Sequence, residues 1–153
     1  MSEELRLNIT SDPANLAEAR RAVEELCARH GFSAAAGADL GLCVNEAVAN
    51  VIRHAYGGAK DRPIRIDATV ESRASGAIAA GKQSAVELQV RVQIRDWGNG
   101  VDPRDLPENA KPKDPLKPGG LGLICMQRML DEFEFRPQTD GMLLEMVKRR
   151  AVE

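Results

Sequence analysis

Residues 40–56 read LGLCVNEAVANVIRHAY and place apolar side chains at helical spacing. This spacing predicts an amphipathic helix over about residues 36–56, and at 100° per residue its buried stripe comprises Cys43, Val44, Ala47, Val48, Val51 and Ala55. Glu46 and Asn50 project one turn apart on the flank of that stripe, where a helix leaves the core and meets a cleft. From this helix alone, a solvated Glu–Asn pair is the simpler interpretation. His54 falls inside the stripe, so we expect it to be half-buried and hydrogen-bonded.

The segments around this helix predict the element order β-α-α-β-β-loop-α-β-β. Before it, LRLNIT alternates as a strand does, Ser11 or Asp12 can cap a first helix, and Gly31 can end it. After it come two more alternating strands, PIRIDATVE and AVELQVRVQIRD. The chain then closes with a hairpin formed by FEFRP and MLLEMVKR, with a turn at Asp140-Gly141. We therefore expect an α/β (α+β) two-layer sandwich, a mostly antiparallel mixed sheet with helices on one face.

Length and composition bound the possibilities. With 153 residues, 43% hydrophobic and 29% charged, the chain fits one soluble domain spanning residues 1–153. A net charge of −2 argues against nucleic acid as a direct partner. No apolar run predicts a membrane span and the N-terminus does not resemble a signal peptide, so we expect a cytoplasmic protein. The cysteines, which are Cys27, Cys43 and Cys125, are expected to be buried free thiols rather than metal ligands.

A carboxylate followed by alternate glycines ends the second of the two central strands. Asp96 is followed by Gly98 and Gly100, and glycines there allow a flat ligand to lie against the backbone. A buried carboxylate could accept a hydrogen bond from an exocyclic amine such as that of adenine. A tight turn alone would need only one of the two glycines. Trp97, between Asp96 and Gly98, is expected to pack at the mouth of the sheet.

A proline-rich loop and a glycine-rich helix start follow. Residues 101–118 hold five prolines without periodicity, and a loop of this length is usually functional or disordered. The segment PGGLGLIC then opens a helix through Gly119, Gly120, Leu121 and Gly122, where free N–H groups could bind phosphate. GAIAAGKQS, residues 76–84, nearly spells a P-loop, but Gln83 lacks the metal-binding hydroxyl and a strand follows. An exposed connection is the better interpretation of that stretch.

Taken together, these motifs resemble those of a known family. E-x-x-x-N on a helix, D-x-G-x-G after a strand and G-G-x-G before a helix are similar to the N-box, G1 and G2 boxes of the GHKL ATP-binding superfamily. Within it, the chain most resembles the small anti-sigma factor serine/threonine kinases of bacterial partner-switching systems. The resemblance covers nearly the whole chain, although the connection at residues 72–84 is long and the loop at 101–118 is rich in proline and lysine.

The resemblance implies a role for each matching residue. Asn50 would supply an oxygen to Mg²⁺, and Glu46 would be the general base that takes the proton from the attacking hydroxyl. Asp96 would bind the adenine amino group, and the glycines of the two loops would contact ATP; they are Gly98, Gly100, Gly119, Gly120 and Gly122, with Leu121 among them. Residues 101–118 would form an ATP lid.

The resemblance also implies partners. The first hypothesis is a kinase that binds Mg-ATP, sequesters a sigma factor and phosphorylates a Ser or Thr of a STAS-type anti-sigma factor antagonist, as a homodimer. The second is a sigma-binding module whose affinity ATP modulates, with weak or no transfer. The third is a detached histidine-kinase catalytic domain, although the chain has no room for a dimerisation helix pair with a phosphoacceptor histidine. Arg20, Arg21 and Glu24 on the first helix could belong to a partner surface, but simple solvation explains them as well.

Overall fold

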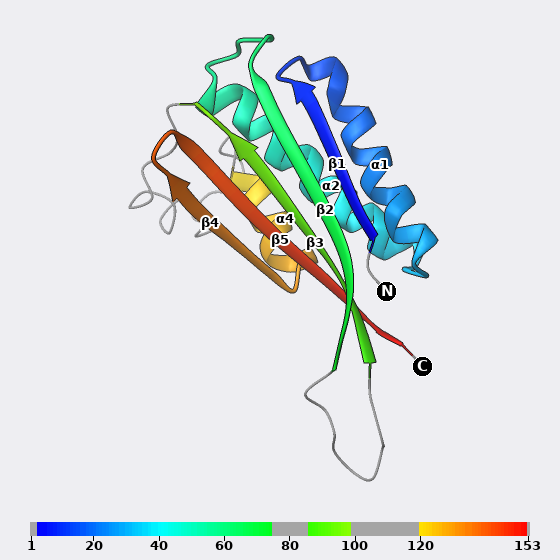
Figure 1. Ribbon diagram of the computed structural model, residues 1–153. Coiled ribbons are helices and arrows are strands. Elements are labelled where there is room, and N and C mark those ends of the chain that lie inside the picture. The colour runs from blue at the N-terminus through cyan, green and yellow to red at the C-terminus, as the bar shows by residue number, and fades with distance from the viewer. Residues whose placement is uncertain (1–2, 75–85, 99–119, 153) are drawn as a thin grey trace.

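The computed structural model describes residues 3–74, 86–98 and 120–152 of the chain. Within these ranges five strands and three α-helices follow one another in the predicted order (Figure 1). The strands are β1 (Glu3–Thr10), β2 (Pro63–Ala74), β3 (Val86–Asp96), β4 (Glu132–Gln138) and β5 (Gly141–Val152). The helices are α1 (Leu16–Arg29), α2 (Ala34–Asn50) and α4 (Gly120–Met129), with short turns η1 (Pro13–Asn15) and η2 (Val51–Ala55).

The strands form one sheet in the order β1-β2-β3-β5-β4, and all four pairings are antiparallel. The α-helices lie on one face of this sheet, as Figure 1 shows. This confirms the two-layer α+β sandwich. The closing hairpin is confirmed too: β4 and β5 pair around a turn after which Gly141 takes a φ of 134°, which glycine adopts without strain.

The core fills the space between the helices and the covered sheet face. Alternate residues of the central strands point into it because side chains of a strand alternate between faces. Its largest fully buried side chains include Leu26, Leu40, Ile64, Ile66, Ile94, Met126 and Met146. Cys27 and Cys43 are buried and form no disulfide here, as predicted, and burial raises the pKa of Cys27 to about 11. The side chain of Cys125 lies outside the described residues.

The first helix begins where the sequence indicated. The Asp12 carboxylate accepts a hydrogen bond from the Ala14 N–H at 2.9 Å, so it caps the η1 turn that leads into α1. At the other end, Gly31 has a φ of 76° and carries the chain away from the helix.

The second helix ends differently from the prediction. α2 stops at Asn50 and a π-helical turn, η2, continues to Ala55, with the Tyr56 N–H bonded to the Val51 carbonyl at 3.0 Å. His54 is exposed, so the expectation that it is half-buried was wrong. The physical reason is that a π-turn contains one more residue than an α-helical turn. By the end of the turn, side chains therefore point in directions rotated by ~100° from those in a continued α-helix.

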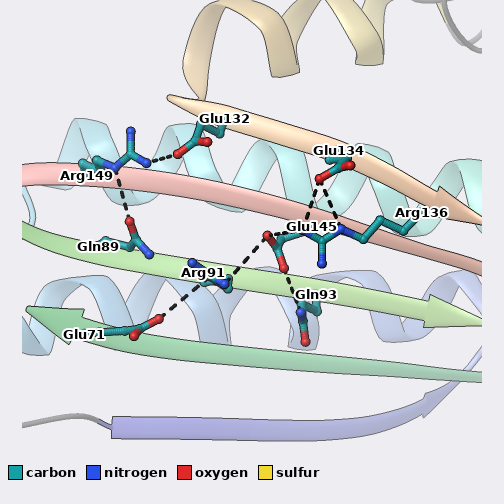
Figure 2. A network of polar contacts seen from close by, with 9 residues as sticks. All are labelled: Glu71, Gln89, Arg91, Gln93, Glu132, Glu134, Arg136, Glu145 and Arg149. Carbon is teal, nitrogen blue, oxygen red and sulfur yellow. Dashed lines mark hydrogen bonds and ion pairs between the residues drawn. The ribbon is translucent and has the colours of Figure 1, made fainter. Parts of the chain in front are cut away.

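The other sheet face carries a network of paired charges instead of helices (Figure 2). Glu145 of β5 lies at its centre and is 7% exposed. Its carboxylate accepts hydrogen bonds from Gln93 at 2.8 Å and Arg136 at 3.3 Å, and Arg91 lies 3.9 Å away. Because Gln93 and Arg91 lie on β3 and Arg136 lies on β4, the network around Glu145 ties β3, β4 and β5 together.

We predict that Glu145→Ala lowers the free energy of unfolding by about 1–3 kcal/mol, because it removes the buried carboxylate that accepts hydrogen bonds from Gln93 and Arg136. Glu134→Ala is the matched control. Glu134 pairs with the same Arg136 but its side chain is 63% exposed, so we expect a change within about 0.5 kcal/mol. Urea unfolding of both variants measures the difference, and equal losses would contradict the assignment.

In the part of the chain that the structure describes, no helix combines the length and apolar character that crossing a bilayer requires.

Candidate functional site

Helix α2 carries Glu46 and Asn50, the polar pair predicted to lie at the edge of its apolar stripe. Ser33 caps this helix by accepting from the Ala36 N–H at 3.0 Å, and the apolar stripe packs on the sheet. Glu46 and Asn50 sit on its flank, one turn apart and half-buried, as their spacing predicts. Within the described ranges the Glu46 carboxylate makes no hydrogen bond or ion pair.

The Asn50 side chain points its oxygen at a cationic group. Its Oδ1 accepts a hydrogen bond from the Arg53 guanidinium at 2.7 Å, and Arg53 is exposed on η2. An oxygen that accepts from one cation at the surface can be reached by another, so the position suits a magnesium ligand. A metal ion bound there would have to displace Arg53, a residue that the sequence argument did not single out. Among the described residues, no cluster of three His, Cys, Asp or Glu side chains could hold a metal.

Asp96 ends β3 with its side chain turned to the covered face of the sheet. The residue is 3% exposed, and its Oδ1 accepts from the Gly98 N–H at 3.0 Å. Burial raises the pKa of Asp96 above its ordinary value, an effect that outweighs the backbone hydrogen bonds from Gly98 and Met142 and the charge of Arg95. A buried carboxylate with one oxygen bonded to the backbone has a second oxygen that a donor could approach.

The end of β3 packs directly on the turn that follows Asn50. A Cβ placed on Gly98 would lie 2.4 Å from the Ala55 carbonyl oxygen, so only glycine fits this approach. The Trp97 N–H donates to the Tyr56 hydroxyl at 2.8 Å. The fold thus brings the Glu46–Asn50 helix and the Asp96 strand end, which are distant in sequence, to the same end of the domain.

Helix α4 lies beside α2 and begins at Gly120, as the glycine pattern predicted. Lys148 links its last turn to α2, because the ammonium donates to the Met129 carbonyl and lies 3.9 Å from Asp39. This contact sets the C-terminal end of α4 beside the first half of α2, and Figure 1 shows the Gly120 end on the side where α2 ends.

Several predicted site residues cannot be placed. Gly100, Gly119 and the lid at residues 101–118 lie outside the described residues, as does the P-loop-like stretch at 76–84. Leu121 and Gly122 belong to the first turn of α4, and the side-chain position of Leu121 is not described. Their predicted phosphate contacts stay predictions.

Trp97 packs at the mouth of the sheet, directly after β3, but is partly open to solvent. The residue is 38% exposed, and the Arg95 guanidinium lies 4.7 Å and that of Arg65 5.9 Å from the ring centroid. Arg95 also pairs with Asp140 at 2.6 Å, so it connects the strand end to the hairpin turn. A hollow of about 520 Å³ lies elsewhere, along β4, and is lined by the paired charges of Figure 2 rather than by the predicted site.

Sequence reasoning missed Tyr56 and Arg53 because both follow the helix in a turn whose type no pattern revealed. Tyr56 is the chain's only tyrosine and comes directly before Gly57-Gly58, which is the one signal that could have drawn attention to it.

Comparisons with known proteins found a matching family model and similar proteins. The family model described as "Histidine kinase-like ATPase domain" matches residues 9–148. A protein named "Serine-protein kinase RsbW" from Listeria monocytogenes is 25% identical over 148 residues, 97% of this chain and 88% of that protein. One of the same name from Bacillus pumilus is 27% identical over 150 residues, 94% of this chain and 84% of its own length.

Among solved structures, a chain of "The crystal structure of SiaB-SiaC complex from Pseudomonas aeruginosa" aligns with a TM-score of 0.48 and 15% identity. The alignment covers 97% of this chain and 89% of that chain, a likeness too slight to bear on function. The family match spans most of the chain and includes Glu46, Asn50 and Asp96. This chain therefore belongs to the family of histidine kinase-like ATPase domains.

Proposed function

We propose that this chain is an Mg-ATP-dependent protein serine/threonine kinase that sequesters a sigma factor and phosphorylates a Ser or Thr of a STAS-type anti-sigma factor antagonist. The observation that carries the proposal is the pair on α2: a carboxylate without a partner among the described residues, one turn before an amide oxygen that accepts from a cation. The family match and the relatives named serine-protein kinase support it.

In this proposal each residue has one task. The second oxygen of Asp96 accepts from the adenine amino group, while its first stays bonded to Gly98. The Asn50 amide oxygen is a magnesium ligand, and bound Mg²⁺ neutralises charge on the phosphates. One neutral amide would suffice as the protein ligand, since Mg²⁺ in nucleotide sites commonly retains waters and binds substrate phosphates. The N–H groups at the start of α4 and the lid at 101–118 hold the phosphates.

The transfer step requires a base beside the γ-phosphorus. The Glu46 carboxylate takes the proton from the attacking Ser or Thr hydroxyl, and the hydroxyl oxygen forms a bond to the γ-phosphorus. The bond to the bridging oxygen of ADP breaks at the same time, and ADP leaves with that electron pair. Positioning and charge neutralisation supply most of what phosphoryl transfer needs. A base and a metal ligand one helical turn apart would provide both beside the γ-phosphate.

We predict that Asn50→Ala weakens ATP binding in the presence of magnesium while leaving the fold intact, because among the described residues the half-buried side chain makes a hydrogen bond only to Arg53. ATP affinity measured with and without magnesium should differ in the wild type and should converge in the variant. Arg53→Ala, which frees the same oxygen without removing it, is the matched control and should keep the magnesium dependence. Equal magnesium dependence in Asn50→Ala would contradict the metal assignment.

The alternative function is a sigma-binding module in which ATP sets the affinity and transfer is weak or absent; a detached histidine-kinase catalytic domain is a third.

We further propose a single domain over residues 1–153, a homodimer and a cytoplasmic location, since sigma factors act there. The deciding experiment mixes the chain, γ-labelled ATP and a STAS-type antagonist, and follows label on the antagonist. Transfer to its Ser or Thr supports the kinase. Sigma binding without transfer favours the module, and label on a histidine favours the third function.

A further inference from the structure

The only tyrosine of the chain bridges three elements at the candidate nucleotide site. The Tyr56 hydroxyl accepts a hydrogen bond from the Trp97 N–H at 2.8 Å and donates one to the Pro63 carbonyl at 2.5 Å. Burial raises the pKa of Tyr56 above its ordinary value, so the phenol keeps the proton that it donates throughout the neutral range. This hydroxyl thus connects the residue after η2 to Trp97, directly after β3, and to Pro63, the first residue of β2.

The π-turn is what aims this side chain. In a continued α-helix, Tyr56 would lie about 120° from Val44, toward the exposed side of α2. The extra residue of the turn removes ~100° of that rotation and brings Tyr56 back over the sheet. The same displacement exposes His54. Single π-turns inside helices occur frequently at functional sites, and this one begins at the residue after Asn50.

The segment held by Tyr56 is the one that carries Asp96. Trp97 follows the carboxylate directly, and the next N–H, that of Gly98, occupies one of its oxygens. Gly98 is at the same time pressed against the Ala55 carbonyl. Any shift of the Trp97 peptide therefore moves both the carboxylate and the backbone donor that orients it.

We propose that Tyr56 is a positioning residue for base recognition, whose hydroxyl fixes the Trp97 peptide and so aims the second oxygen of Asp96 at the adenine amino group. The proposal rests on the proposed function for the identity of the ligand. It adds that one side chain, Tyr56, connects the π-turn after Asn50, the proposed magnesium ligand, to the end of β3, where the base is proposed to bind.

The test is Tyr56→Phe, which keeps the ring and removes only the hydroxyl. We expect ATP affinity to fall about 3- to 10-fold, the effect of one net hydrogen bond, with little change in the weaker affinity for GTP. The ATP-to-GTP preference should therefore shrink by that factor. Amide hydrogen exchange of Trp97 should become faster, because its N–H loses its acceptor. A merely structural role would lower stability without changing the preference between the two bases.

Ser11→Ala is the matched control. Ser11 is fully buried, and its hydroxyl likewise makes two backbone contacts, donating to the Ala59 carbonyl and accepting from the Arg62 N–H at 3.0 Å. We expect this variant to lose stability and to keep the wild-type preference for ATP. If Tyr56→Phe binds both nucleotides like the wild type, or loses affinity for both equally, Tyr56 does not position Asp96. If the wild type binds no ATP at all, the proposed function fails instead, so the two failures are distinguishable.

Discussion

Glu46→Gln is expected to slow phosphoryl transfer to the antagonist by about 10²–10⁴-fold, the usual effect of removing a general base. The amide has the size and shape of the carboxylate but cannot accept the proton of the attacking hydroxyl. ATP affinity should hardly change, because the proposed contacts to the nucleotide come from Asn50, Asp96 and the glycine loops. The measurement is label transfer from γ-labelled ATP, run beside a nucleotide titration.

Glu25→Gln is the matched control for this variant. It makes the same change of charge on the exposed side of α1, so it should transfer phosphate at the wild-type rate. Undiminished transfer by Glu46→Gln would remove Glu46 from the mechanism. An absence of transfer in the wild type, with its correct antagonist present, would favour the binding module and leave Glu46 without a catalytic task.

Asp96→Asn is expected to reduce ATP affinity at least tenfold and to abolish the preference for ATP over GTP. The reason is the number of acceptors. The carboxylate can serve the Gly98 N–H and the adenine amino group with separate oxygens, whereas the amide has one oxygen for both donors. An unmade buried hydrogen bond costs about 1–3 kcal/mol, and 1.4 kcal/mol corresponds to a factor of ten. Guanine presents a carbonyl oxygen at that position, so GTP affinity should not fall with it.

The same variant should not lose stability at neutral pH. Since burial raises the folded-state pKa of Asp96, the ionised group costs folding free energy, and stability falls as pH rises through that raised pKa. Asn removes this cost, so the free energy of unfolding should stay equal or increase. ATP affinity of the wild type should decrease as pH falls through the raised pKa, while that of the variant stays flat.

Asp61→Asn removes a carboxylate that is 90% exposed and should change neither affinity nor stability. If Asp96→Asn is destabilised and still prefers ATP, the carboxylate is a structural group and not the base-recognition residue. The opposite pattern, lower affinity in a more stable protein, is what distinguishes a group retained for function from one retained for folding.

The sequence by itself determined the architecture, because alternation and helical spacing record which face of each element is buried. The strands ending at Thr10 and Asp96, the cap at Asp12 and the turn before Gly141 all agree with the structure. The same patterns placed Glu46 and Asn50 together on α2, since residues four apart in a helix are neighbours by geometry alone. Local rules sufficed for these features.

Only the tertiary structure decided how the pieces of the candidate site meet. The helix period predicted that His54 is half-buried, but packing of the helix end against Gly98 and Trp97 accompanies a π-turn that no local pattern marks. The roles of Tyr56 and Arg53 depend on that turn. Contacts between residues some forty positions apart, such as Tyr56 with Trp97, depend on how α2 is set on the sheet. Such contacts leave no periodic pattern in the sequence, so they could be identified only from the packing of the helices on the sheet.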